Sequence, residues 1–74
     1  MVNIRERLTL RAYRITAGIK AEEVAEAAGV TIDTVYKWER GKSFPNAPQM
    51  IKILSLFSEK GFAIDLHDIS FPGQ

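Results

Sequence analysis

The sequence contains no cysteine, one histidine and only three prolines among its 74 residues. Without cysteine neither a disulfide framework nor a thiolate metal site can form, and one histidine cannot complete a zinc shell. We therefore expect no metal and no cofactor. The longest uninterrupted apolar stretch covers only residues 62–64, which is too short to cross a membrane. Residues 5–7 are all charged where a signal peptide needs its apolar stretch, so a cytoplasmic location without membrane contact is expected.

The composition predicts one small folded domain. Hydrophobic residues make up 46% of the chain and charged residues 26%, so the chain can bury apolar surface and is not expected to be disordered throughout. Its length allows a single hydrophobic core. Because no disulfide can form, the stability of this core must come from side-chain packing.

Charge is distributed unevenly along the chain, although the net charge is only +1. Residues 1–20 carry five basic residues and one acidic residue, whereas residues 21–40 carry five acidic and two basic residues. A basic segment attracts nucleic acid, but a solvated helix face explains the same pattern. The charge pattern alone leaves both interpretations open.

Glycines divide the chain into segments of helical periodicity. Glycine adopts the left-handed conformation that ends a helix at little cost, and no segment shows the alternation typical of a strand. The predicted helices cover residues 4–17, 21–28 and 31–40, then a fourth with Pro48 in its first turn that ends at Gly61, then a short turn from Asp65 to Ile69. The sequence therefore predicts an all-α fold of five helices.

Caps and apolar spacing define the start and the inner face of these helices. Asn3 is expected to cap the first helix with Glu6 reaching back, and Thr31 to cap the third. The apolar residues expected inside are Ile4, Leu8, Ala12 and Ile15 in the first helix, Val24, Ala25 and Ala28 in the second, Val35 and Trp38 in the third, and Met50, Leu54 and Phe57 in the fourth, with Ile51, Ile53 and Leu56 beside them.

Residues 21–42 carry the most specific signal in the chain. Ala25 is small where two helix backbones must approach, Gly29 permits the positive φ of a tight turn, and Thr31 can cap the next helix. The remaining matching positions are Val30, Val35 and residues 38–42. In combination these residues closely resemble the helix-turn-helix of the phage repressor and Cro-like (XRE) family.

The resemblance implies a compact lambda-repressor-like domain over residues 1–69, with residues 70–74 as a frayed tail. It implies binding to a double-stranded DNA operator and transcriptional regulation of the repressor type, with the helix over residues 31–40 in the major groove. The positions implied to read bases are Ile32, Asp33, Thr34, Tyr36 and Lys37. Those implied to contact the DNA backbone are Lys20, Ala21, Glu22, Thr31, Arg40, Lys42 and Ser43.

Three reading positions also have a purely structural explanation. A lysine donates to guanine O6 or N7, an aspartate accepts from the cytosine amino group, and an aliphatic side chain contacts the thymine methyl group. The alternatives are a core contact for Ile32, a favourable helix-dipole position for Asp33 and a solvated charge for Lys37. The sequence also departs from the family at Lys20 and Ala21, where a cap-forming residue and a glutamine are common. Main-chain N–H groups and the lysine must then bind the phosphate.

The resemblance further implies a structural ion pair between Arg14 and Glu39, shielded by Trp38. A single small module reads too few base pairs for the selectivity of a regulator, so we expect a homodimer, at least on DNA. The candidate dimer contacts are Phe44, Phe62 and Phe71, whereas Leu66 is expected to close the core.

Two other function classes compete with a DNA-binding regulator. An antitoxin or adaptor would use the same fold mainly to bind a protein partner, and the fold alone does not exclude this. An enzyme is disfavoured, because the chain has no glycine-rich phosphate loop and no cluster of metal ligands, and because His67 on the last turn reads as a surface residue. We therefore expect no enzymatic activity.

Overall fold

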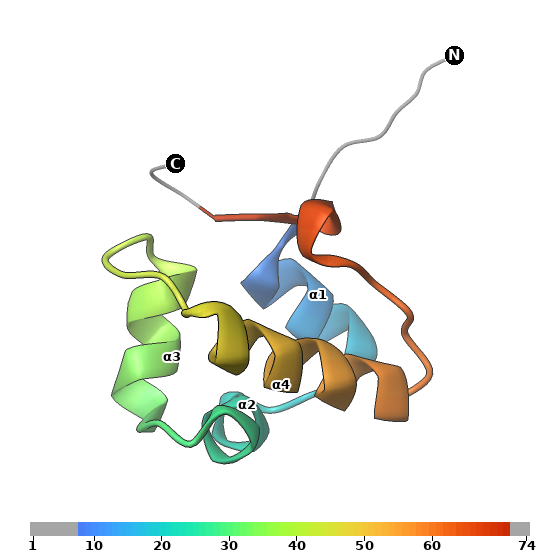
Figure 1. The fold of residues 1–74 in the computed structure, drawn as a ribbon, viewed down its shortest axis with the longest axis horizontal. Coiled ribbons are helices and arrows are strands. Elements are labelled where there is room, and N and C mark those ends of the chain that lie inside the picture. Colours follow the sequence, from blue (N-terminus) through green and yellow to red (C-terminus); the bar gives the residue numbers. More distant parts are fainter. Residues whose placement is uncertain (1–7, 72–74) are drawn as a thin grey trace.

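The computed structural model describes residues 8–71, which form four α-helices and one pair of short strands. The elements are β1 (Leu8–Thr9), α1 (Leu10–Ala17), α2 (Ala21–Ala28), α3 (Ile32–Glu39), α4 (Ala47–Glu59), the 3₁₀ turn η1 (Leu66–Asp68) and β2 (Ile69–Ser70). The strands pair in parallel, with Leu8 opposite Ile69. In Figure 1, α4 crosses the middle of the molecule, with α3 at one end of it and α1 beside it.

The predicted count of five helices is wrong for the described residues, because the last element is a single 3₁₀ turn. Asp65 does cap it: its Oδ1 accepts from the His67 N–H at 3.2 Å, and Asp68 Oδ2 accepts from the Asp65 N–H at 2.9 Å. A three-residue turn is too short for the hydrogen bonds of an α-helix. The chain then continues as β2, a strand of two residues that periodicity could not indicate.

The first helix begins at Leu10 rather than at the predicted Ile4. Leu8 is extended in β1, and the side chain of Thr9 caps α1 by accepting from the Ala12 N–H at 3.1 Å. The predicted cap at Asn3 lies outside the described residues. Strand pairing with β2 uses the backbone groups that Leu8 and Thr9 would need within a helix, which explains the later start.

The buried face of α1 also differs from the prediction. Leu10 is buried and Tyr13 packs against the core, whereas Ile15, predicted to lie inside, is 54% exposed. Leu8 is exposed as well. The buried residues Leu10 and Tyr13 have helical spacing, and so do the residues that were predicted to lie inside. The contact with α4 decides between them, because the ring of Tyr13 meets the ring of Phe57 edge-on with centroids 6.4 Å apart.

The core lies between the helices and extends to the C-terminal strand. The expected inner residues of α2 and α3 are all buried, as are Met50, Ile53 and Phe57 of α4. Ile51 was expected to extend this apolar stripe but is 64% exposed. Ser70 pairs with Thr9 and Phe71 is buried, so ordered structure continues two residues past the expected boundary at Ile69.

Candidate nucleic-acid interface

A tight turn joins α2 to α3. Gly29 has φ of 74°, and beyond the adjoining chain no atom lies within 4 Å of the position that a Cβ would take there. The backbone conformation, rather than lack of space, therefore requires glycine. The Val30 N–H donates to the carbonyl of Ala25 at 2.9 Å and closes the end of α2. In Figure 1, α2 is seen almost end-on while α3 lies in the plane of the view, so the two helices cross steeply.

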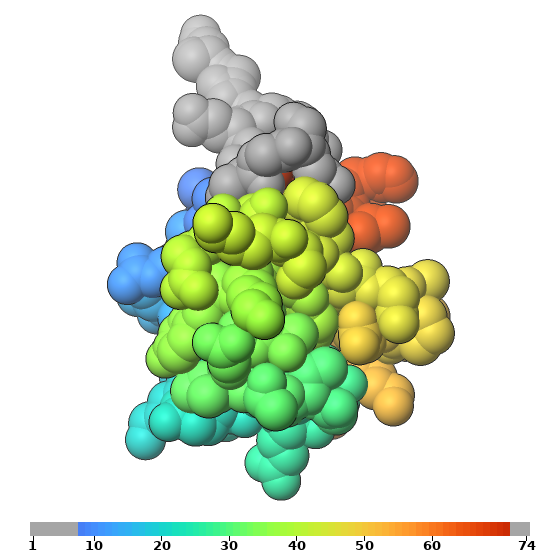
Figure 2. Space-filling view, turned by 90° about the vertical axis from the view of Figure 1, so that its left-hand side faces the viewer, coloured from blue at the N-terminus to red at the C-terminus, as the bar shows by residue number. Residues whose placement is uncertain are grey.

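Two buried side chains and a cap fix α3 in this position. Val35 is fully buried and Trp38 is 2% exposed, which anchors the inner face of the helix. The hydroxyl of Thr31 accepts from the Thr34 N–H at 3.3 Å and lies 3.1 Å from the hydroxyl of Thr34. Because the inner face is anchored, the opposite face of α3 points outward, and Figure 2 shows it at the centre of one side of the molecule.

The five residues of α3 that are predicted to read bases differ in their exposure to solvent. Asp33, Tyr36 and Lys37 are exposed. Ile32 and Thr34 are half-buried, and Ile32 packs against the core, which supports the structural explanation for Ile32. Asp33 Oδ2 lies 3.5 Å from Lys37 Nζ, with the two side chains 69% and 52% exposed. An acceptor and a donor thus stand side by side on the exposed face.

The start of α2 combines main-chain amides with a charged side chain that sequence reasoning missed. The Lys20 N–H donates to Glu23 Oε1 at 2.9 Å, and Lys60 Nζ lies 3.1 Å from Glu23 Oε2. The hydrogen bond from Lys20, helped by Lys60, lowers the pKa of Glu23 below its ordinary value of 4.5. The glutamate three residues after the cap was a visible signal for the first contact, but nothing in the sequence indicated Lys60.

The predicted backbone-contacting residues lie at the start of α2, directly before α3 and directly after α3. At the start of α2, Lys20 and Glu22 are exposed, whereas the side chain of Ala21 is buried, so Ala21 can offer only its amide. After α3, Arg40 and Lys42 are exposed and Ser43 is half-buried; Thr31, before α3, is also exposed. Figure 2 shows the segment near residue 20 (cyan) below α3 and the segment after residue 40 (yellow-green) above it.

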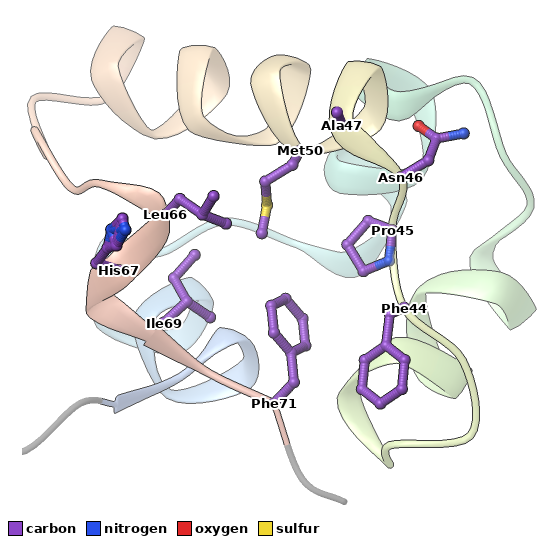
Figure 3. Close-up of a pocket in the computed structure, with 9 residues that line it drawn as sticks. All are labelled: Phe44, Pro45, Asn46, Ala47, Met50, Leu66, His67, Ile69 and Phe71. Atoms are coloured by element: carbon purple, nitrogen blue, oxygen red, sulfur yellow. The ribbon is translucent and has the colours of Figure 1, made fainter. Parts of the chain in front are cut away.

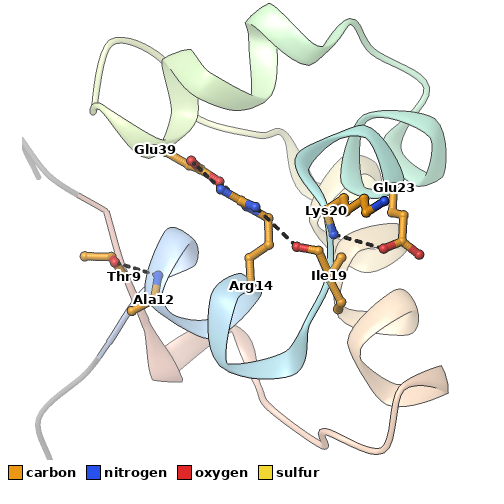
Figure 4. A network of polar contacts seen from close by, with 7 residues as sticks. All are labelled: Thr9, Ala12, Arg14, Ile19, Lys20, Glu23 and Glu39. Carbon is orange, nitrogen blue, oxygen red and sulfur yellow. Dashed lines mark hydrogen bonds and ion pairs between the residues drawn. The ribbon is translucent and has the colours of Figure 1, made fainter.

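An ion pair links the end of α3 to α1 (Figure 4). Arg14 Nε lies 2.7 Å from Glu39 Oε2, and Arg14 Nη2 lies 3.3 Å from Glu39 Oε1. Arg14 Nη1 also donates to the carbonyl of Ile19 at 3.2 Å, in the connection between α1 and α2. The side chains are only 11% and 3% exposed. One guanidinium therefore holds three segments of the domain together.

A groove of about 440 Å³ runs between the α3–α4 loop and the C-terminal segment (Figure 3). Of the three predicted dimer contacts, Phe44 is 45% exposed on its rim, whereas Phe71 is buried and Phe62 packs partly buried against the core. Leu66, expected to close the core, is instead 51% exposed. Phe71 belongs to the buried core, and its ring also packs edge-on against that of Phe44, with centroids 6.0 Å apart.

Residues 8–71 offer neither a metal-binding cluster nor a membrane-spanning helix. That range contains no group of three or more histidine, aspartate or glutamate side chains placed to hold a metal ion. None of its helices is long and apolar enough to cross a membrane.

Comparison with known protein families agrees with the arrangement of helices described above. A helix-turn-helix family model matches residues 10–60, which include α1, α2, α3 and α4. Searches of curated proteins and of solved structures gave no significant match. The matched family is a DNA-binding regulatory family. The match covers more than half of the chain and includes the tight turn and the exposed helix described above, so the chain belongs to the XRE/Cro-like helix-turn-helix family.

Proposed function

We propose that the protein is a sequence-specific transcriptional regulator of the repressor and Cro type, which binds a double-stranded DNA operator and inserts α3 into the major groove. The exposed face of α3 carries this proposal. Asp33, Tyr36, Lys37 and Arg40 are all exposed, and their spacing places them on one side of the helix. An α-helix fits the major groove, where polar side chains distinguish all four base pairs.

The remaining contacts position the protein on the DNA backbone. The first amides of a helix have no carbonyl partner within the helix, so those of Ala21 and Glu22 can bind a phosphate beside Lys20. Thr31, Arg40, Lys42 and Ser43 bind phosphates near α3. The carboxylates of Glu22 and Glu23 oppose the phosphates, and this weakens sequence-independent affinity. Base contacts must then supply a larger share of the binding free energy.

Selection from a pool of random duplexes tests this function. The pure protein is incubated with the pool, and bound fragments are recovered and sequenced over several rounds. We expect enrichment of one sequence. Placed over a promoter, that sequence should lower transcription of a reporter when the protein is expressed, which tests the repressor type. A pool that stays random would contradict DNA recognition, and capture of a stoichiometric protein partner would then favour the antitoxin or adaptor.

Two lysines should have different roles in binding. Lys37→Ala should change the base preferred at one position of the site, at a cost of about 1 to 3 kcal/mol. Lys42→Ala should weaken binding to all sequences alike and lower the slope of log K against log salt by about one. Titration of the selected duplex and its single-base variants at several salt concentrations measures both effects. Unchanged base preferences in Lys37→Ala would remove this lysine from base reading.

The protein should bind its operator as a twofold dimer. One module cannot reach the preference for specific over nonspecific DNA of about 10³ to 10⁷ that regulators show, whereas two modules on one face of the duplex can. The operator should be a near-palindrome with half-site centres roughly 34 to 36 Å apart. Phe44→Ser should weaken binding to the full operator but not to a single half-site. A footprint of one asymmetric half-site, filled by one chain at full affinity, would contradict the dimer.

A further inference from the structure

We propose that Asp33 and Lys37 act together as one recognition unit, which selects a cytosine facing Asp33 beside a guanine facing Lys37 in each operator half-site. This inference rests on the proposed function and specifies the DNA that it requires. It starts from the exposed pair itself, because Asp33 Oδ2 and Lys37 Nζ are 3.5 Å apart on the outer face of α3.

Among the five positions predicted to read bases, Asp33 and Lys37 are the two that carry a charge, and both are exposed. Ile32 is half-buried against the core, and the hydroxyl of Thr34 lies 3.1 Å from that of Thr31. The side chains of Asp33 and Lys37 remain 69% and 52% exposed. An exposed ion pair with this separation contributes little to stability. Its two ends are therefore free to exchange their mutual contact for contacts with base edges.

The chemistry of the pair matches a cytosine and a guanine. An ionised carboxylate only accepts hydrogen bonds, and an ammonium group only donates them. In the major groove cytosine presents its N4 amino group as a donor, and guanine presents O6 and N7 as acceptors. Adenine also has a donor at N6, but its N7 acceptor stands beside it and repels a carboxylate. Cytosine has no acceptor next to its amino group, so Asp33 should prefer it.

Electrostatics makes Asp33 a strong discriminator. The phosphates surround the groove with negative potential, so a carboxylate there is tolerated only where a donor meets it. Opposite thymine O4 or guanine O6, the carboxylate would face a second acceptor with no proton between them. Lys37 offsets the charge of Asp33 and supplies the donor for the guanine. Asp33 therefore disfavours every base other than cytosine at its position, and Lys37 binds the guanine at the position beside it.

The test compares base preferences of wild type, Asp33→Asn and Glu59→Gln in the same random-duplex selection. Wild type should enrich cytosine at one position of each half-site, and replacing that cytosine should lower affinity about 5- to 100-fold. Asp33→Asn should shift the preference at that position to adenine, because an amide both donates to N7 and accepts from N6. Glu59→Gln also removes one negative charge, but at the end of α4, and should leave every preference unchanged.

The possible results separate this inference from the proposed function. If wild type and Asp33→Asn enrich the same sequence with the same bases at all positions, the recognition unit is wrong while DNA recognition by the protein stands. A preference for thymine or guanine at the position that responds to Asp33→Asn would also overturn it. If wild type enriches no sequence, both the recognition unit and the proposed function fall. Circular dichroism confirms that each variant is folded.

Discussion

Arg14→Met is expected to destabilise the domain by about 3 to 5 kcal/mol, because it leaves the carboxylate of Glu39 buried without its partner. The side chain of Glu39 is only 3% exposed, and two of its contacts come from Arg14, at 2.7 and 3.3 Å. Domains of this size have a total stability of about 4 to 11 kcal/mol. The variant should therefore lose a large part of its total stability, as measured by urea denaturation followed by circular dichroism.

A double-mutant cycle separates the ion pair from the other contacts of Arg14. Arg14→Met combined with Glu39→Leu should recover part of the lost stability, since no buried charge remains without a partner. The hydrogen bond from Arg14 to the carbonyl of Ile19 is lost in both variants and cancels in the comparison. Arg11→Met is the matched control, because Arg11 is exposed on the same helix, and should change stability by less than about 0.5 kcal/mol. Additive losses in the cycle would contradict a coupled pair.

The second large effect is expected on α4, where the same substitution at two nearby positions should have different consequences. Ile53→Ala should lower the free energy of unfolding by about 2 to 5 kcal/mol, since Ile53 is completely buried and its loss leaves a cavity. Ile51→Ala should change it by less than about 0.5 kcal/mol, because Ile51 is 64% exposed. Urea denaturation of the two variants measures both effects. Equal losses would contradict the orientation of α4.

Ile51 and Ile53 show that the periodicity of a sequence does not determine which apolar residues of a helix are buried. Six apolar residues lie close together in α4, namely Met50, Ile51, Ile53, Leu54, Leu56 and Phe57. Such a wide stripe allows the helix to be rotated about its axis in more than one way. Packing against α2 and the contact between Tyr13 and Phe57 select the rotation that buries Ile53 and exposes Ile51. The sequence predicted the helix and the burial of Met50 and Phe57, but not that Ile53 lies inside while Ile51 lies outside.

The family relationship was accessible from the sequence because it depends on local requirements. Gly29 is needed for a left-handed backbone conformation, and Thr31 for a hydroxyl that caps α3. Both act within a few residues along the chain. The bounds of α2 and the inner residues of α2 and α3 followed from the same local signals. The resemblance built on these residues was confirmed by the family match over residues 10–60.

Contacts between distant parts of the chain decided the rest. The parallel pairing of Leu8 with Ile69 set the start of α1, and the burial of Phe71 beside the ring of Phe44 placed residue 71 of the expected tail in the core. Lys60, which directly follows α4, contacts Glu23 in α2. The two residues are far apart in the sequence, so no local pattern predicts this contact. A sequence specifies caps, turns and periodicity through neighbouring residues. The rotation of helices, the pairing of chain ends and the choice between exposed and buried apolar residues depend on which surfaces meet in three dimensions, and only the tertiary structure determines that.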